Sequence, residues 1–284
     1  MPLNRECVGR EYPPITTEVT LDALQKYARA YNDNNPAFFD ASRRGGIVAP
    51  PMFAVTVIWN SVMGAAMDPD VHADLLRLVH GEQDMEFLNP IRPGDVITAA
   101  SKIISIETKV TGETMTVEAN ARNQDGQPVL KTLFSVFIRG RRNRDIAPAE
   151  PRVLEPDRGE PLYTVAQTID LDQTFRYRDA SGDRNPIHVD ETVAKMAGLP
   201  GIIVHGLCTM AFTSKVVIDH SCAGDPLRLK RLRVRFSRPV LPGQTITTKV
   251  WAGGENEGRR IFAYETFNPE GQAVIKSGLA EIAP

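Results

Sequence analysis

The stretch YRDASGDRNPIHVD, Tyr177–Asp190, shows how the whole chain is organised, because a related stretch occurs earlier in the sequence. The earlier copy, YARAYNDNNPAFFD at Tyr27–Asp40, lies 150 positions upstream and shares the tyrosine, an aspartate, the Asn-Pro pair and the final aspartate. Gly-Asp and Asn-Pro are turn-forming pairs, so the stretch alone indicates a polar turn. The repetition indicates that this turn belongs to a larger duplicated unit.

Three further pairs of segments repeat in the same order. GGIVAPPM at 45–52 matches PGIIVHGL at 200–207, FLNPIRPGDVIT at 87–98 matches FSRPVLPGQTIT at 236–247, and DGQPVLK at 125–131 matches EGQAVIK at 270–276. We therefore expect two equivalent domains, residues 1–138 (copy one) and 163–284 (copy two). A charged, proline-rich linker at 139–162 separates them.

The composition restricts the class of protein. Hydrophobic residues make up 42% and charged residues 24%, as in soluble globular proteins. The formal net charge of −2 gives no overall positive field, and no apolar run approaches the ~20 residues of a membrane span, so we expect neither nucleic-acid binding nor membrane insertion. Three cysteines without metal-type spacing favour a reducing, cytoplasmic location.

The same order of elements is expected in each copy. A short helix (21–32 and 169–180) precedes the Asn-Pro loop, and a long apolar helix (52–67 and 207–220) follows it. The remaining segments, 96–108, 114–138, 231–240, 244–253 and 259–282, alternate polar with β-branched or aromatic residues, with Asp-Gly and Glu-Gly turns. This order predicts an α+β fold in which an antiparallel sheet wraps each long helix and the two sheets join edge to edge.

Copy two resembles the MaoC-like family of R-specific enoyl-CoA hydratases, also called hydratase 2. The family signature places an aromatic residue before Gly-Asp-x-Asn-Pro, then an aliphatic residue, a histidine and a small residue six positions later. It is matched by Tyr177, Gly182, Asp183, Asn185, Pro186, Ile187, His188 and Ala194, and the following turn into the long helix by His205-Gly206. The resemblance implies a double-hotdog fold and a hydro-lyase of fatty acid metabolism, which adds water reversibly to trans-2-enoyl-CoA and gives (3R)-3-hydroxyacyl-CoA.

The resemblance also implies roles for individual residues. Asp183 and His188 would hold and deprotonate the attacking water. Asn185 would orient the site by hydrogen bonding, and the backbone N–H of Gly206, at a helix start, would polarise the thioester carbonyl. We expect no cofactor, because coenzyme A is part of the substrate, and we expect a homodimer.

Two histidines of copy two have alternative interpretations. His205 fits a buried, satisfied imidazole or a positioning residue better than a catalyst. A metal site built on His188 is disfavoured, because the sequence offers no second suitable histidine nearby and zinc usually takes three protein ligands.

Copy one departs from the pattern at two positions. Phe38 stands where His188 does, and Pro51, which has no N–H, stands where Gly206 does. We therefore expect copy one to be non-catalytic. In the double-hotdog family the degenerate half is thought to house the acyl chain.

A row of arginines is the candidate for binding the phosphates of coenzyme A. Arg231, Arg233 and Arg235 alternate with apolar residues, which puts them on one face of a strand. They could contact phosphates, and a simple solvated face is the alternative.

Other functions remain open at this point. A related enzyme could act on a branched or dicarboxylic enoyl-CoA or on an acyl-carrier-protein thioester. A hotdog thioesterase would cleave such substrates, but its usual acid lies on the long helix, and neither long helix has an early Asp or Glu. A non-catalytic acyl-binding protein would require both copies to be degenerate.

Overall fold

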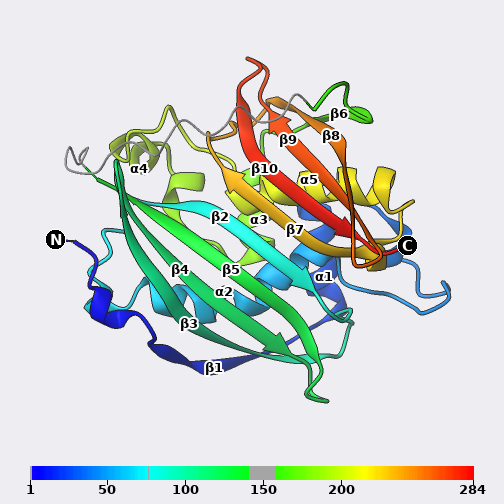
Figure 1. Ribbon diagram of the computed structural model, residues 1–284, viewed down its shortest axis with the longest axis horizontal. Coiled ribbons are helices and arrows are strands. Elements are labelled where there is room, and N and C mark those ends of the chain that lie inside the picture. Colours follow the sequence, from blue (N-terminus) through cyan, green and yellow to red (C-terminus); the bar gives the residue numbers. More distant parts are fainter. Residues whose placement is uncertain (1, 76, 141–157) are drawn as a thin grey trace.

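The computed structural model describes residues 2–75, 77–140 and 158–284. Within them, ten strands form one antiparallel sheet in the order β1-β3-β4-β5-β2-β7-β10-β9-β8-β6 (Figure 1). Copy one contributes β1 (Glu11–Glu18), β2 (Leu78–Phe87), β3 (Val96–Lys109), β4 (Gly112–Arg122) and β5 (Pro128–Arg139). Copy two contributes β6 (Tyr163–Thr168), β7 (Leu229–Phe236), β8 (Thr245–Asn256), β9 (Arg259–Phe267) and β10 (Ala273–Ile282). Residues 141–157 of the expected linker lie outside the described residues, and Arg139 at its start is the last residue of β5.

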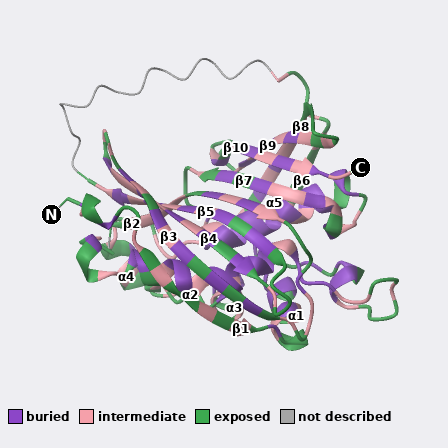
Figure 2. Cartoon of the chain, turned by 60° about the horizontal axis from the view of Figure 1, so that its bottom comes forward, coloured by how far each residue is buried: buried purple, intermediate pink, exposed green. Residues whose placement is uncertain are grey.

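The helices cover one face of this sheet (Figures 1 and 2). They are α1 (Leu21–Ala30), α2 (Ala54–Ala66), α3 (Gln173–Ser181), α4 (Glu191–Met196) and α5 (Gly206–Ser221). The helix α2 packs against β1, β3 and β4, and α5 packs against β7 and β10. Each copy therefore consists of a sheet around one long helix, and the expected double-hotdog fold is confirmed.

Among the described residues, none of the helices has both the length and the apolar character that a membrane span requires.

The two half-sheets meet at the pair β2–β7. Gln83 lies opposite Val234, and Met85 lies opposite Leu232, in antiparallel register. The expected edge-to-edge joining is thus correct, and it leaves β1 and β6 as the outer strands. In β1, Pro13 and Pro14 lack the N–H groups that an added strand would need, which protects this edge from further pairing.

Three strands were not expected from the sequence: β1, β2 and β6. The two prolines of β1 argue against a strand, except at an edge. The sequence of β2, LVHGEQDMEF, has no regular alternation of polar and apolar residues, so it did not indicate a strand. It lies between β5 and β7, and its acidic residues point to the outer face of the sheet. The long helix of copy one also starts later than expected, at Ala54, because Pro51–Phe53 form a 3₁₀ turn.

Equivalent residues of the two copies meet between α1 and α3. The hydroxyls of Tyr27 and Tyr177 lie 2.8 Å apart, and both side chains are fully buried. Because these residues are related by the 150-residue repeat, their contact lies where the two copies face each other. A buried hydroxyl needs a partner, and here each tyrosine provides it for the other.

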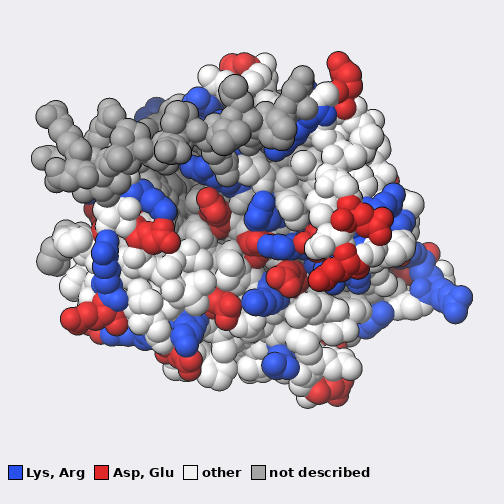
Figure 3. All heavy atoms as spheres, in the orientation of Figure 1, with Lys and Arg blue, Asp and Glu red and all other residues white. Residues whose placement is uncertain are grey.

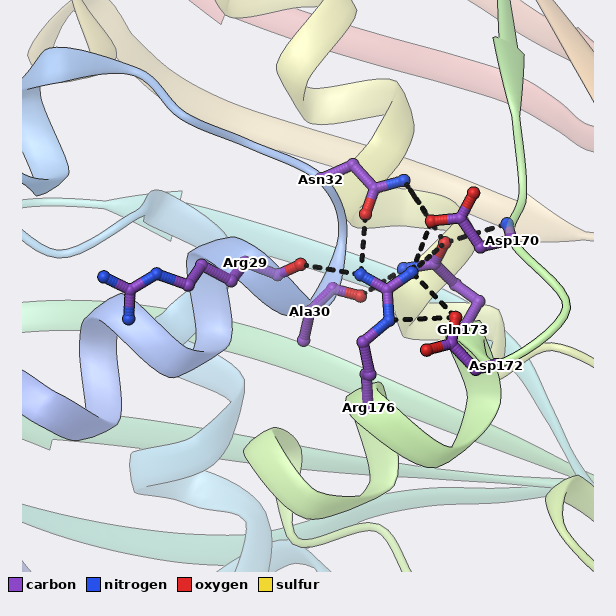
Figure 4. A network of polar contacts seen from close by, with 7 residues as sticks. All are labelled: Arg29, Ala30, Asn32, Asp170, Asp172, Gln173 and Arg176. Carbon is purple, nitrogen blue, oxygen red and sulfur yellow. Dashed lines mark hydrogen bonds and ion pairs between the residues drawn. The ribbon is translucent and has the colours of Figure 1, made fainter.

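A polar network links the same two helices nearer the surface (Figure 4). Asn32 adopts a left-handed backbone (φ 59°) just after α1 and donates from Nδ2 to Oδ2 of Asp170, at 3.0 Å. Arg176 donates from Nη1 to Oδ1 of Asn32 at 2.9 Å and to the carbonyl of Arg29 at 3.2 Å. Gln173 donates to the carbonyl of Ala30 at the end of α1. The network satisfies carbonyls that the end of α1 leaves without helical partners.

Candidate functional site

The loop after α3 is a turn that brings His188 back toward Asp183. Gly182 ends the helix with a left-handed backbone (φ 81°), which glycine adopts readily. Oδ1 of Asp183 accepts the N–H of Asn185 at 3.1 Å, and Oδ1 of Asn185 accepts the N–H of Ile187 at 3.3 Å. The 3₁₀ helix Pro186–His188 follows.

Copy one forms the same turn with the same side chains. Oδ1 of Asp33 accepts the N–H of Asn35 at 3.0 Å, and Oδ1 of Asn35 accepts the N–H of Ala37 at 2.9 Å. The aspartate and asparagine therefore stabilise the turn in both copies, and the expected polar turn is confirmed. The difference between the copies is the residue at the end of the turn: Phe38 in copy one and His188 in copy two.

His188 is held in one tautomer. Its Nδ1 lies 2.8 Å from the carbonyl of Ile203, which can only accept a hydrogen bond, so Nδ1 carries the proton and Nε2 is free to accept one. Burial lowers the pKa of His188, and the charge of Asp183 partly opposes this shift. Burial raises the pKa of Asp183, and His188 partly opposes it. The pKa values of the two groups are thereby brought closer to each other, which favours proton exchange between them.

His205 stacks on His188. The ring centroids lie 3.8 Å apart at 24°, and Nε2 of His205 lies 3.2 Å from the carbonyl oxygen of Asp183. The expectation of no second histidine near His188 is wrong: His205 is 17 positions away along the sequence, but folding brings the two rings into contact. His205 is buried, as expected, but its Nδ1 has no hydrogen-bond partner within the described residues, so the imidazole is only half satisfied.

Asp183, His188 and His205 place potential metal ligand atoms within 4.8 Å of one another. The two imidazoles are stacked and nearly parallel, so a metal ion bound in the plane of one ring would lie well out of the plane of the other. A tetrahedral metal site needs converging ligands. This geometry is better suited to proton exchange than to holding a metal ion.

The carboxyl and imidazole of this pair face a cavity of about 320 Å³. Gly206, the first residue of α5, also lines it, and the first N–H groups of a helix have no helical acceptor. Most of the other walls are apolar or aromatic and come from both copies. They include Trp59, Met63, Leu78, Val79, His80, Phe134 and Val136 of copy one, and Ile187, Leu199, Ile203, Leu207, Phe236 and Val240 of copy two.

The sequence of the chain is similar to that of known proteins over nearly its whole length. Residues 154–272 match the family model described as "MaoC like domain", and residues 6–132 match "FAS1-like, dehydratase domain region". The chain is 35% identical to "Probable enoyl-CoA hydratase 2" of Dictyostelium discoideum, over 99% of this chain and 95% of that protein. The chain belongs to the MaoC-like enoyl-CoA hydratase 2 family.

Other members of the family extend the comparison. "Peroxisomal multifunctional enzyme type 2" of Drosophila melanogaster is 30% identical over 75% of this chain, which matches 36% of that longer protein. The crystal structure of a "MaoC-like dehydratase" from Phytophthora capsici superimposes with a TM-score of 0.81 at 27% identity, over 99% of this chain and 98% of that one. The resemblance inferred from the sequence is confirmed.

The family's machinery is absent from the equivalent place in copy one. Phe38 is fully buried, and Asp33 is buried with Oδ1 3.9 Å from Nζ of Lys215. A cavity of only about 50 Å³ lies at the start of α2, lined by Pro51, Phe87 and Val129 among others. These residues match Gly206, Phe236 and Val274 in the repeat, so the large cavity has a small apolar counterpart.

The row of arginines lies on the other face of the sheet from the cavity. Leu232 and Val234 are buried and Phe236 lines the cavity, so the alternate residues Arg231, Arg233 and Arg235 point to the outer face. Acidic and basic side chains intermingle there (Figure 3). Arg231 binds the carboxylate of Asp84 through Nε and Nη2, at 2.8 and 2.7 Å, and Arg235 lies 3.7 Å from Glu82. None of the three lines the cavity, and their assignment to coenzyme A phosphates stays a prediction.

Sequence reasoning missed several cavity residues. Trp59 and Phe134 fit the patterns of a core helix and a core strand, and His80 had no neighbours of note along the sequence. In the structure His80 stacks on Phe134, with centroids 3.9 Å apart. Arg238 lies in the repeated segment at 236–247, which was a usable signal, since equivalent segments of two copies occupy equivalent places.

Proposed function

We propose that this enzyme is an R-specific 2-enoyl-CoA hydratase, which adds water reversibly to trans-2-enoyl-CoA to give (3R)-3-hydroxyacyl-CoA. The observation that supports this most strongly is the Asp183–His188 pair at the wall of an apolar cavity that Gly206 also lines. The names of its relatives support the same reaction class, a hydro-lyase.

In the proposed mechanism the Asp183–His188 pair holds one water molecule. As the water oxygen bonds to C3 of the enoyl group, the pair takes one of its protons at Nε2 of His188 or at the carboxylate. The electron pair of the double bond moves toward the thioester carbonyl, where the N–H of Gly206 stabilises the negative charge. The pair then returns a proton to C2. The sum is the addition of H and OH without a change of redox state, so no redox cofactor is needed.

We place the acyl chain against copy one. The cavity walls formed by Trp59, Met63, Phe134 and Val136 are apolar and lie on α2 and β5. An apolar chain gains about 0.8 kcal/mol for each methylene group that it buries. A non-catalytic copy can thus contribute to substrate binding.

The phosphates of coenzyme A need cations near the cavity, and Arg139 and Arg238 line it. The strands β5 and β7 are both antiparallel to β2, so their C-terminal ends lie at the same end of the sheet. Arg139 ends β5, and Arg238 lies two residues beyond β7. Two strand spacings separate such positions, about 10 Å, a distance that one extended, multiply charged ligand can bridge. We favour these arginines over Arg231, Arg233 and Arg235.

The proposal includes a location and an oligomeric state. All three cysteines, Cys7, Cys208 and Cys222, are buried free thiols, as suits a reducing, cytoplasmic location. We also propose a homodimer, as the family resemblance implies, and light scattering of the purified protein would test it.

The deciding experiment is an assay with crotonyl-CoA and longer trans-2-enoyl-CoA esters. We expect loss of the enoyl absorbance and formation of the (3R)-hydroxy product. Asp183→Asn and His188→Ala should each lower kcat by about 10²–10⁴-fold, as expected when a general acid–base group is lost.

Asp33→Asn is the matched control, because Asp33 forms the same turn in copy one but does not line the large cavity. It should leave kcat unchanged. Thioester cleavage without hydration, or hydration giving the (3S) product, would refute the proposal. Equal loss of kcat in Asp33→Asn would refute the assignment of catalysis to copy two.

A further inference from the structure

The imidazole of His205 is a buried polar group next to the site that the proposed mechanism does not use. It is 1% exposed and does not line the cavity, so substrate binding does not account for it. Its Nδ1 is buried without a hydrogen-bond partner in the described part of the chain. Burying an unpaired polar atom costs stability, so a phenylalanine or a leucine at this place would pack at lower cost.

The contacts of His205 connect the two parts of the proposed site. It is the N-cap residue of α5, immediately before Gly206. Its Nε2 lies 3.2 Å from the carbonyl oxygen of Asp183, so this nitrogen carries the proton and donates. The N–H of Asp183 in turn donates to Oγ of Ser181 at 3.2 Å. The backbone of Asp183 is thereby held on both sides.

The ring is also fixed by its neighbours. It stacks on His188 at 3.8 Å and lies 5.1 Å from the ring of Tyr177, whose hydroxyl is bound to Tyr27. Burial lowers the pKa of His205 well below its usual value, and His188 adds to this shift. A neutral ring of one tautomer therefore occupies this place, and it can stack on His188 without competing for its proton.

The two copies supply an internal comparison. The position of His205 is occupied in copy one by Pro50, which precedes Pro51. The imidazole at this position thus occurs in the copy that has His188 and Gly206, and it is missing in the copy that lacks both.

We propose that His205 is a positioning residue, which ties the backbone of Asp183 to the start of α5 and so fixes the acid–base pair relative to the N–H of Gly206. The inference rests on the proposed function. It concerns a residue that acts through Asp183 and His188 and does not itself touch the substrate.

The test compares two substitutions in the full chain. His205→Phe keeps a stacked ring but has no donor, and His205→Gln has an amide N–H that can reach the carbonyl of Asp183. We expect His205→Phe to lower kcat by up to about 100-fold with KM unchanged, as a misplacement of about 1 Å can do, and His205→Gln to recover most of this loss. A kcat for His205→Phe equal to that of the wild type, a change confined to KM, or a Gln variant as slow as the Phe variant would overturn the proposal.

A second measurement does not depend on the His205 variants or on activity. His80 is also neutral and protonated at Nε2, because burial lowers its pKa to about 3 and this nitrogen lies 3.1 Å from the carbonyl of Glu82. It is therefore replaced first: in a ¹⁵N-histidine NMR spectrum of the His80→Gln protein, one of the four remaining histidines should be neutral and protonated at Nε2 throughout the pH range in which the fold is stable. The absence of such a signal would overturn the inference even if both variants failed to fold. Failure of the wild type to hydrate any enoyl ester would instead reject the proposed function, with this NMR result unaffected.

Discussion

Asp183 and Asp33 occupy the same place in two copies of one turn, and both accept the N–H of the residue two positions later. Their surroundings differ: Asp183 lines the large cavity, whereas Asp33 is sealed beside Lys215. At the scale of single residues, the same turn aspartate is therefore suited to catalysis only in the copy where it lines a cavity beside a histidine. A half-buried carboxyl placed for chemistry costs stability, and this cost can be measured.

We expect Asp183→Asn to be more stable than the wild type at neutral pH. Burial raises the pKa of Asp183 in the folded protein above the ordinary 3.8, so the folded state binds more protons than the unfolded chain between these two pKa values. Wild-type stability is therefore lost as pH rises through this window, and the penalty is fully present above the raised pKa. Asparagine does not carry this penalty.

The measurement is Tm by calorimetry between about pH 4 and pH 8. The excess in Tm of Asp183→Asn over the wild type should be largest at the neutral end and shrink toward pH 4. Asp179→Asn is a control for which the opposite change is expected. A hydrogen bond from Arg178 lowers the pKa of Asp179, so the charged carboxylate stabilises the fold and its loss should lower Tm at neutral pH. A lower Tm for Asp183→Asn at neutral pH would contradict the prediction.

Among the elements, the start of α5 differs most from its equivalent in copy one. Gly206 provides an N–H at the first helical position, where Pro51 in copy one has none. A Cβ at Gly206 would lie 3.3 Å from Cε1 of Phe236, so glycine also leaves room at the cavity wall. Gly206 thus makes two contributions to the site, a backbone N–H and free space beside Phe236, and two substitutions distinguish between them.

We expect Gly206→Pro to lower kcat by about 10²–10³-fold, the usual effect of losing one oxyanion donor. Proline is tolerated at the first position of a helix, so Tm should change little. Gly206→Ala is the matched control, because it adds the same Cβ and keeps the N–H. If Gly206→Ala loses as much kcat as Gly206→Pro, crowding against Phe236 explains the effect and the N–H does not.

The ends of β5 and β7 give a second prediction at the level of elements. Arg238→Gln should raise KM for crotonyl-CoA about tenfold or more, the value of one charge-assisted hydrogen bond to a phosphate. KM for the N-acetylcysteamine thioester, which has no phosphates, should not change. Arg233→Gln, on the outer face of β7, is the control. A higher KM for Arg233→Gln alone would instead support the row Arg231, Arg233 and Arg235.

At the scale of the whole molecule, the two copies are held together by contacts between segments that are equivalent in the repeat. The strands β2 and β7 join the sheets, and Tyr27 and Tyr177 join the helices α1 and α3 on the other side. The tyrosine pair lies next to His205, so the contact between the copies also supports the site. Its contribution can be measured with a double-mutant cycle.

We expect Tyr27→Phe and Tyr177→Phe each to lower the free energy of unfolding by about 1–3 kcal/mol, because each leaves the other hydroxyl buried and unpaired. The double variant should lose less than the sum of the two, since both polar groups are then gone. Urea denaturation monitored by fluorescence measures all three. Additive losses would show that the two hydroxyls do not depend on each other.

The sequence by itself determined the duplication, the long helix of each copy and the pairing of Asp183 with His188. These features depend on residues close along the chain: turn hydrogen bonds act over two or three positions, and helix periodicity over about four. The place of His205 beside His188, the cavity walls from copy one and the outward direction of Arg231, Arg233 and Arg235 were decided only by the tertiary structure. Each depends on packing between distant segments, above all the pairing of β2 with β7, and β2 has no strand pattern of its own.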